Sequence, residues 1–244
     1  MKIENFLSPT FIDYEGKVAA ILFVPGCNFR CPYCHAQDIV YGKGALPVEQ
    51  FLDYIRKKKD WLDGVVVCGG EPTLQTGLCE FIQQLKTFDL AVKLDTNGSN
   101  PAVLEKLLER NLIDYIAMDV KAPPDLYHFA TGIQADTSAI EASIQIASQF
   151  PGYEFRTTVA PFITENDTSS SKMRFMTPPE AIELAQWIVN ASGTNLHPYY
   201  LQKFVPHEGK LINAALENMS KTPEPLLQEM YEQVKVILPN TQIR

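Results

Sequence analysis

The hydrophobic positions of this chain fall into six short apolar runs separated by amphipathic stretches. Runs rich in β-branched residues predict strands at residues 19–24, 64–68, 91–95, 115–119, 154–159 and 196–201. Helical periodicity predicts helices at residues 47–58, 78–85, 101–110, 138–149 and 178–190, and after the last strand at 226–238. Apolar strands that alternate with helices predict an α/β protein with a parallel sheet. The pattern fits both a flat doubly wound sheet and a curled, open one.

The length and composition favour one compact domain. The chain has 244 residues, 45% of them hydrophobic, and no Gly/Ser-rich or charged linker divides it. We therefore expect a single domain over residues 1–244, with a core at about 16–205 and a helical tail at about 206–244.

Charge and hydropathy argue against nucleic-acid and membrane partners. The net charge is −8, and the one basic run, residues 56–59, is too short for a broad phosphate-binding surface. No apolar run approaches the roughly 20 residues that cross a bilayer. The first residues form neither a basic nor an apolar targeting segment, so a cytoplasmic protein is expected.

Polar residues follow four consecutive predicted strands. A cysteine-rich loop follows the first, and residues 69–71, 95–98 and 119–121 follow the next three. Ligands of parallel α/β folds bind at the carboxyl ends of the strands. The four strand ends therefore predict one common site.

The cysteine-rich loop carries the most specific pattern of the chain. Cys27, Cys31 and Cys34 form a C-x3-C-x2-C triplet directly after an apolar strand. Three soft thiolates on one loop suit a [4Fe–4S] cluster, which takes one ligand per iron. Because no fourth cysteine lies nearby, one iron is left open to bind a small molecule.

Two other interpretations of the cysteines are less favourable. A zinc site could recruit His35, but structural zinc sites usually spread their ligands over two short pairs. A disulfide framework disagrees with the odd count of five cysteines. Cys68 and Cys79 lie on a predicted strand and a predicted helix, where both are expected to be small buried hydrophobic residues.

The triplet and its neighbours resemble the radical S-adenosylmethionine (radical SAM) superfamily, in which the open iron chelates S-adenosylmethionine. The resemblance implies a partial (β/α)6 barrel with an open parallel sheet. Gly69, Gly70 and Glu71 precede Pro72 and resemble the GGEP motif, which holds the amino group of that cofactor. The alternative is a plain glycine-rich turn. Their position on a loop makes a buried role for Glu71 unexpected.

Further runs resemble glycyl-radical activating enzymes within this superfamily. The D-T-N-G run, with Asp95, Thr96 and Asn97, implies contacts to the ribose and carboxylate of the cofactor. The D-x-K run, with Asp119 and Lys121, implies a carboxylate contact, and the acids imply a monovalent cation nearby. An Asx turn and a strand-end ion pair are the alternatives. In the same way Tyr33 is expected beside the adenine, or simply as a packing residue.

The region of the last strand departs from part of this family. Pyruvate formate-lyase activating enzymes carry a cofactor-contacting histidine there, whereas this chain has Tyr200 or Gln202 in that place. His197 and His207 lie nearby but out of register. This segment and the I-D-Y-x-G-K run at residues 12–17 are more similar to the activating proteins of anaerobic ribonucleoside-triphosphate reductase.

The resemblance implies an oxidoreductase that activates a glycyl-radical enzyme, with anaerobic ribonucleotide reductase as the expected partner. A flavodoxin or ferredoxin would reduce the cluster. Reductive cleavage of S-adenosylmethionine then yields a 5′-deoxyadenosyl radical, which takes hydrogen from a glycine of the partner. The alternatives are a pyruvate formate-lyase activating enzyme, a small-molecule enzyme such as 7-carboxy-7-deazaguanine synthase, and a non-catalytic iron–sulfur or zinc-binding module.

Overall fold

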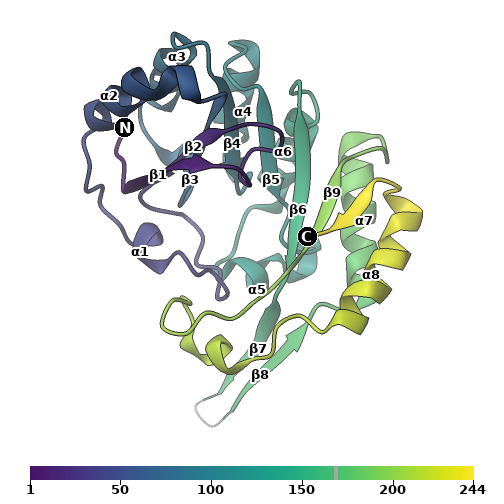
Figure 1. The fold of residues 1–244 in the computed structure, drawn as a ribbon. Coiled ribbons are helices and arrows are strands. Elements are labelled where there is room, and N and C mark those ends of the chain that lie inside the picture. The colour runs from purple at the N-terminus through teal and green to yellow at the C-terminus, as the bar shows by residue number, and fades with distance from the viewer. Residues whose placement is uncertain (168–169) are drawn as a thin grey trace.

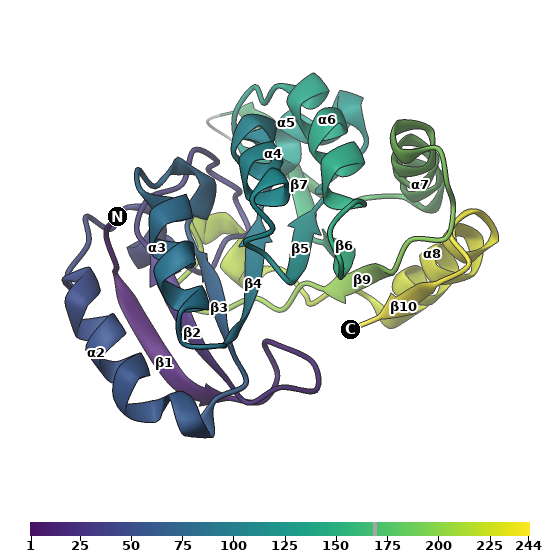
Figure 2. The ribbon, with the colours of Figure 1, turned by 90° about the horizontal axis from the view of Figure 1, so that it is seen from above.

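The chain folds around a curled, eight-stranded sheet with helices on its outer face (Figures 1 and 2). This computed structural model describes residues 1–167 and 170–244. In spatial order the strands are β1 (Asn5–Thr10), β2 (Ala19–Val24), β3 (Gly64–Gly69), β4 (Ala91–Thr96), β5 (Tyr115–Asp119), β6 (Tyr153–Val159), β9 (Tyr199–Lys203) and β10 (Thr241–Ile243). Only β1 runs antiparallel to its neighbour in this sheet. Within the described residues β1 and β10 do not pair, so the sheet is open.

Helices connect the parallel strands and cover the convex face of the sheet (Figure 2). They are α2 (Val48–Lys58), α3 (Leu78–Lys86), α4 (Pro101–Glu109), α6 (Thr137–Ala147), α7 (Pro178–Ser192) and α8 (Glu224–Ile237). The short helices α1 (Gln37–Val40) and α5 (Tyr127–Thr131) lie instead beside the cysteine-rich loop, and their carbonyls accept hydrogen bonds from Gly26 and Arg30 (Figure 1). Proline occupies the first turn of α4 and α7, where its missing N–H costs no helical hydrogen bond. Thr177 and Glu180 form a reciprocal capping box at the start of α7.

The two faces of the sheet differ in chemistry. Residues such as Leu22, Val67 and Leu94 point to the helices and belong to the main apolar core. The concave face is apolar on β2 and β3, where Ile21 and Val66 pack with Tyr14. On β4 to β6 that face instead carries charged side chains, which are described with the site below. The helices therefore bury one face, while the other face remains available for ligands.

The predicted α/β architecture with an open, mainly parallel sheet is confirmed. The strands predicted at 19–24 and 115–119 match β2 and β5 at both ends. The last predicted strand starts too early, because β9 begins at Tyr199. Leu196 is 63% exposed, and His197 is buried in a loop, where its ring nitrogens contact the hydroxyls of Tyr153 and Ser192.

Four strands were not predicted. β1 is an edge strand that contains Pro9 and buries only Thr10, so it lacks a core pattern. The polar strands β7 (Pro161–Asp167) and β8 (Ser170–Phe175) form an antiparallel hairpin that projects at the lower end of Figure 1. The segment predicted as a helical tail ends in β10, which pairs with β9. No helix in the described part of the chain is long and apolar enough to cross a membrane.

Candidate functional site

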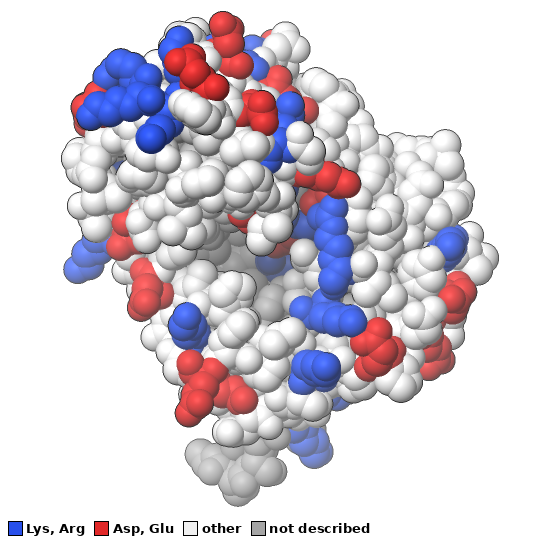
Figure 3. Space-filling view, viewed as in Figure 1, with Lys and Arg blue, Asp and Glu red and all other residues white. Residues whose placement is uncertain are grey.

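A cavity of about 490 Å³ lies at the carboxyl ends of the parallel strands. Figure 3 shows the surface hollowed near the centre of that view. The predicted site residues that line the cavity are Cys27, Cys31, Tyr33, Cys34, Gly69, Gly70, Asp95, Thr96, Asn97, Asp119 and Lys121. The four strand ends therefore meet at one site, as the sequence predicted.

The cysteine loop, residues 25–36, has its shape fixed by contacts with the rest of the protein. The Arg30 backbone N–H donates to the Thr131 carbonyl at 2.7 Å, and the Arg30 guanidinium donates to the carbonyls of Cys27 and Phe29. The Phe29 ring packs edge-on against Tyr127. The Arg30 side chain thus binds backbone carbonyls of its own loop and stabilises the shape of that loop. All three thiols of the loop line the same cavity.

The three thiols are free and differ in burial. Cys31 is 7% exposed, and Cys27 and Cys34 are half-buried. Burial raises the pKa of Cys27, and it raises the pKa of Cys31 to about 12. Clusters and metals bind thiolates, so ligand binding here displaces protons. No three His, Cys, Asp or Glu side chains in the described residues are close enough to share a single metal ion.

The two glycines at the end of β3 are required by the close approach of β2 and the cysteine loop. A Cβ on Gly70 would lie 1.9 Å from the Gly26 carbonyl oxygen, and one on Gly69 would lie 2.3 Å from the Val24 nitrogen. Gly69 also has a φ of +125°, which favours glycine. The Glu71 backbone N–H donates to the Gly26 carbonyl at 2.8 Å. The backbone of β2 and of the cysteine loop therefore fills the space in which a Cβ of either glycine would lie.

Glu71 is buried, which corrects the expectation that a buried role was improbable. It is 0% exposed, and its carboxylate accepts hydrogen bonds from the Thr73 N–H and hydroxyl, the Thr96 hydroxyl and the Asn97 N–H, at 2.6–3.1 Å. Burial raises the pKa of Glu71, and these hydrogen bonds oppose part of that rise. Glu71 does not line the cavity. Glu71 instead connects the ends of β3 and β4 beneath the cavity.

Replacement of Glu71 by alanine should therefore destabilise the fold. The variant leaves several buried donors without an acceptor, so the free energy of unfolding should fall by about 3 kcal/mol. Urea unfolding of the cluster-free protein measures this change. Glu80→Ala is the matched control on an exposed face of α3, where it should change stability by less than about 0.5 kcal/mol. Equal stability of the two variants would contradict the role assigned to Glu71.

Asn97 links the end of β4 to the cysteine loop. Its side-chain amide donates to Asn28 Oδ1 at 3.0 Å and lies 3.8 Å from the Cys27 sulfur. Its Oδ1 accepts from the Ser99 N–H at 2.9 Å, which is the Asx turn considered for this run. Asn97 therefore forms the Asx turn and is also part of the site.

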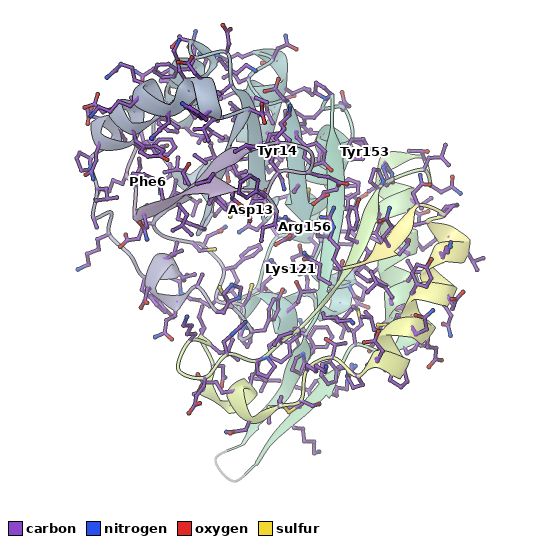
Figure 4. The ribbon with its side chains drawn as sticks, viewed as in Figure 1. Phe6, Asp13, Tyr14, Lys121, Tyr153 and Arg156 are labelled. Atoms are coloured by element: carbon purple, nitrogen blue, oxygen red, sulfur yellow. The ribbon has the colours of Figure 1, made fainter. Side chains whose placement is uncertain are left out.

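Arg156 is the principal site residue that the sequence analysis missed. It lies on β6, and its guanidinium donates to Asp119 Oδ1 at 2.9 Å and to Asp95 Oδ2 at 3.0 Å. Lys121 donates to the other Asp119 oxygen at 3.2 Å. Figure 4 shows Arg156 and Lys121 near each other at the centre of the view. An arginine in the middle of a predicted strand was the signal that could have revealed this residue.

The charges of this group are mutually compensated. Burial alone would raise the pKa of Asp119, but Arg156 and Lys121 together bring it below its ordinary value. Burial opposes the charge of Arg156, and Asp95 and Asp119 more than offset that effect and raise its pKa. Among buried oxygens of the described residues, Asp95 Oδ1 has no hydrogen-bond partner, and Lys93 Nζ lies 3.6 Å from it. The carboxylates of Asp95 and Asp119 are therefore each paired with fixed positive charge at the cavity wall.

The structure also shows which of the candidate residues in and around β9 line the cavity. Gln202 and His207 line the cavity, whereas Tyr200 and His197 do not. The Tyr200 ring lies under the Arg244 guanidinium, 3.5 Å from the ring centroid. Other unpredicted lining residues are Phe29, His35, Val40, Arg156, Thr158, Lys203, Phe204 and Val205.

The two remaining cysteines have different surroundings. Cys68 lines the cavity as well as packing on the inner apolar cluster, so its description as a purely buried residue was incomplete. Burial raises its pKa and keeps it a thiol. Cys79 packs against the main core, partly buried.

Comparisons with known proteins identify the family. The family model described as Radical SAM superfamily matches residues 21–170. A glycyl-radical enzyme activating enzyme of Methanocaldococcus jannaschii is 39% identical over 146 residues, which are 58% of this chain and 59% of that protein. The pyruvate formate-lyase 1-activating enzyme of Escherichia coli is 27% identical, over 75% of this chain and 79% of that one. A 7-carboxy-7-deazaguanine synthase of Hyperthermus butylicus is 37% identical over 36% of this chain and 38% of that one.

A solved structure extends the comparison to the fold. Streptococcus suis SuiB bound to S-adenosylmethionine superposes with a TM-score of 0.59 at 15% identity, covering 92% of this chain and 51% of that one. The chain belongs to the Radical SAM superfamily. The predicted superfamily and its open, partial-barrel sheet are confirmed.

The cofactors of this superfamily are a [4Fe–4S] cluster and S-adenosylmethionine, and the residues here fit both. Three free thiols on one loop supply the soft donor set of the cluster. The cavity beside them has the volume of a small-molecule site, for which about 300–1,000 Å³ is typical. The cofactor prediction is therefore confirmed at the level of the family.

Proposed function

We propose that this chain activates a glycyl-radical enzyme, with anaerobic ribonucleotide reductase as its target. The observation that carries the proposal is the meeting of Cys27, Cys31 and Cys34 with Asp119 and Lys121 in one cavity. The D-T-N-G and D-x-K runs that resemble activating enzymes both contribute to that cavity. Relatives described as activating enzymes support the same class.

Each part of the cavity has a definite task in this proposal. The three cysteines hold the cluster, and Lys121 supplies positive charge for the carboxylate of S-adenosylmethionine. Gly69 and Gly70 also line the cavity, where they offer backbone groups to the cofactor. When bound, the cluster and S-adenosylmethionine together supply a 5′-deoxyadenosyl radical that takes a hydrogen atom from a glycine of the target. The protein orients the cofactor and excludes water.

The adenine and the monovalent cation have candidate positions. Tyr33 lines the cavity beside the cluster cysteines, and we assign it to the adenine end of the cofactor. Asp95 and Asp119 line the cavity and supply the carboxylate oxygens for a cation, which would replace one of the lysine or arginine contacts that these oxygens make in this structure. Oxygen ligands are those that hard cations prefer.

The proposal includes two protein partners in the cytoplasm. One is the large glycyl-radical enzyme, whose glycine loop enters the hollow of Figure 3. The other is an electron donor, a flavodoxin or ferredoxin, that reduces the cluster. A partner that completes the cavity fits a site of this kind better than a small substrate that the chain would have to enclose alone.

Electron paramagnetic resonance tests the proposal. The cluster-loaded protein, S-adenosylmethionine, an electron donor and anaerobic ribonucleotide reductase should together give a carbon-centred glycyl doublet. The matched control is a reductase whose radical glycine is replaced by alanine, which should give no doublet. We also expect cleavage of S-adenosylmethionine to be slow and uncoupled without the reductase.

The main alternative is a small-molecule radical enzyme. The similarity to a 7-carboxy-7-deazaguanine synthase, which spans about a third of the chain, is the observation that favours it. Turnover of a free pterin without any protein partner would support that alternative and contradict the activase proposal. Magnesium dependence of such turnover would support it further.

A further inference from the structure

We propose that residues 205–219, named here the strap, hold the cysteine loop in its cluster-binding conformation and restrict access to it. In Figure 1 the strap crosses the lower part of the view between β9 and α8. The inference needs the three cysteines to be cluster ligands, and it does not depend on which protein is activated.

The strap is hydrogen-bonded to the cysteine loop through the backbone. The Ile212 N–H donates to the Cys34 carbonyl at 3.0 Å, and the Asn213 N–H donates to the Pro32 carbonyl at 3.0 Å. One acceptor thus belongs to a ligand residue, and the other lies two residues before it. The strap therefore restrains the segment between the second and third cysteines.

Buried side chains anchor the strap at this position. Leu216 is 0% exposed and packs with Leu211, Phe204 and Ala160 in an apolar cluster separate from the main core. Tyr33 of the cysteine loop packs against the same cluster. Leu216 of the strap and Tyr33 of the cysteine loop therefore pack in the same apolar cluster.

Hydrogen bonds also hold together the two residues that flank the strap, Phe204 and Thr222. The Phe204 N–H donates to the Thr222 hydroxyl at 2.7 Å, and the Thr222 N–H returns a bond to the Phe204 carbonyl at 3.0 Å. The Thr222 hydroxyl also donates to the Val159 carbonyl of β6 at 2.8 Å. A loop with closed ends and its own packed side chains is held as a unit, in the manner of an Ω-loop.

The strap also forms part of the cavity wall. Val205 and His207 line the cavity, and the His207 ring lies 5.5 Å from that of His35, the residue after Cys34. The same segment thus contacts the cysteine loop from outside and borders the cavity. Opening of the strap should expose the cysteine loop without unfolding the sheet, since local openings of this kind cost less than global unfolding.

A charge in the apolar anchor tests the strap. In cluster-free Leu216→Asp, alkylation of Cys34 by iodoacetamide, followed by mass spectrometry, should be about tenfold faster than in the unaltered protein. Cys79 lies outside the strap and should keep its rate. Leu196→Asp is the matched control at an exposed leucine and should leave both rates unchanged. In cluster-loaded protein under anaerobic conditions, a chelator should bleach the cluster absorbance faster in Leu216→Asp only.

A second pair of variants separates the strap from general destabilisation. Ile212→Pro removes the N–H that binds the Cys34 carbonyl, whereas Ile212→Ala keeps it. Faster alkylation of Cys34 in Ile212→Pro than in Ile212→Ala supports the proposal. Equal rates in these two variants overturn it. If Leu216→Asp accelerates Cys34 and Cys79 equally, the Ile212 pair alone decides.

Discussion

Alanine at Cys27, Cys31 or Cys34 should abolish the reductive cleavage of S-adenosylmethionine. Each thiolate would hold a different iron of the cluster, and the loop has no fourth cysteine to replace one of the three. After anaerobic reconstitution the unaltered protein should hold about four iron and four sulfide per chain, as the cluster requires. Iron, sulfide and methionine assays on the same samples measure the effect.

Cys79→Ala is the matched control for these variants. Cys79 lies on α3 and packs against the main core, away from the cavity. It should keep both the cluster and the cleavage activity. Cleavage at the full rate in Cys31→Ala, or stoichiometric zinc in place of iron, would contradict the assignment of the cluster.

The strand ends explain why so much of the site could be predicted from the sequence. A buried parallel strand has a recognisable apolar pattern, and such strands place their carboxyl ends at one edge of the sheet. Polar runs that follow them, such as those at Asp95 and Asp119, therefore meet in space. The pattern did not fix the curl of the sheet, which came from the family resemblance.

The partners of individual side chains could not be predicted in the same way. Glu71 was taken for a cavity residue, but its four hydrogen bonds come from residues on two different strand ends. Arg156 was overlooked because an arginine within a strand has no fixed meaning until the neighbouring strands are known. The register sets Arg156 beside Asp119, and that contact depends on the whole sheet.

The strap was missed because irregular segments carry no periodic signal. The apolar positions of residues 205–219 follow neither a strand nor a helix period over the whole segment, and these residues were predicted as part of a helical tail. Two leucines, Leu211 and Leu216, anchor the segment, and the other members of their cluster come mainly from β7, β8, the residue after β9 and the cysteine loop. Such contacts between distant parts of the chain follow from the fold and not from local sequence.

Removal of the positive charge of Arg156 should strongly destabilise the protein at neutral pH. The Arg156 side chain is 14% exposed and binds both Asp95 and Asp119. In Arg156→Gln these partly buried carboxylates keep only Lys93 and Lys121 beside them. Breaking a buried ion pair in this way costs about 3–5 kcal/mol of unfolding free energy. Arg174→Gln is the matched control, because Arg174 pairs with Glu180 at the surface, where the loss should be about 1 kcal/mol or less.

The pH dependence of this loss distinguishes charge from packing. In the unaltered protein the folded-state pKa of Asp119 is lowered, so its stabilising contribution is present above its unfolded pKa of about 4 and is lost only as the pH falls below that value. In Arg156→Gln the pKa of Asp119 should rise, because burial is no longer offset by the guanidinium. A protonated carboxyl needs no counter-charge, so the stability difference between the two proteins should shrink as the pH falls from 7 towards about 5. Urea unfolding at several pH values measures this difference, and a loss that stays constant with pH would mean that Arg156 acts through packing alone.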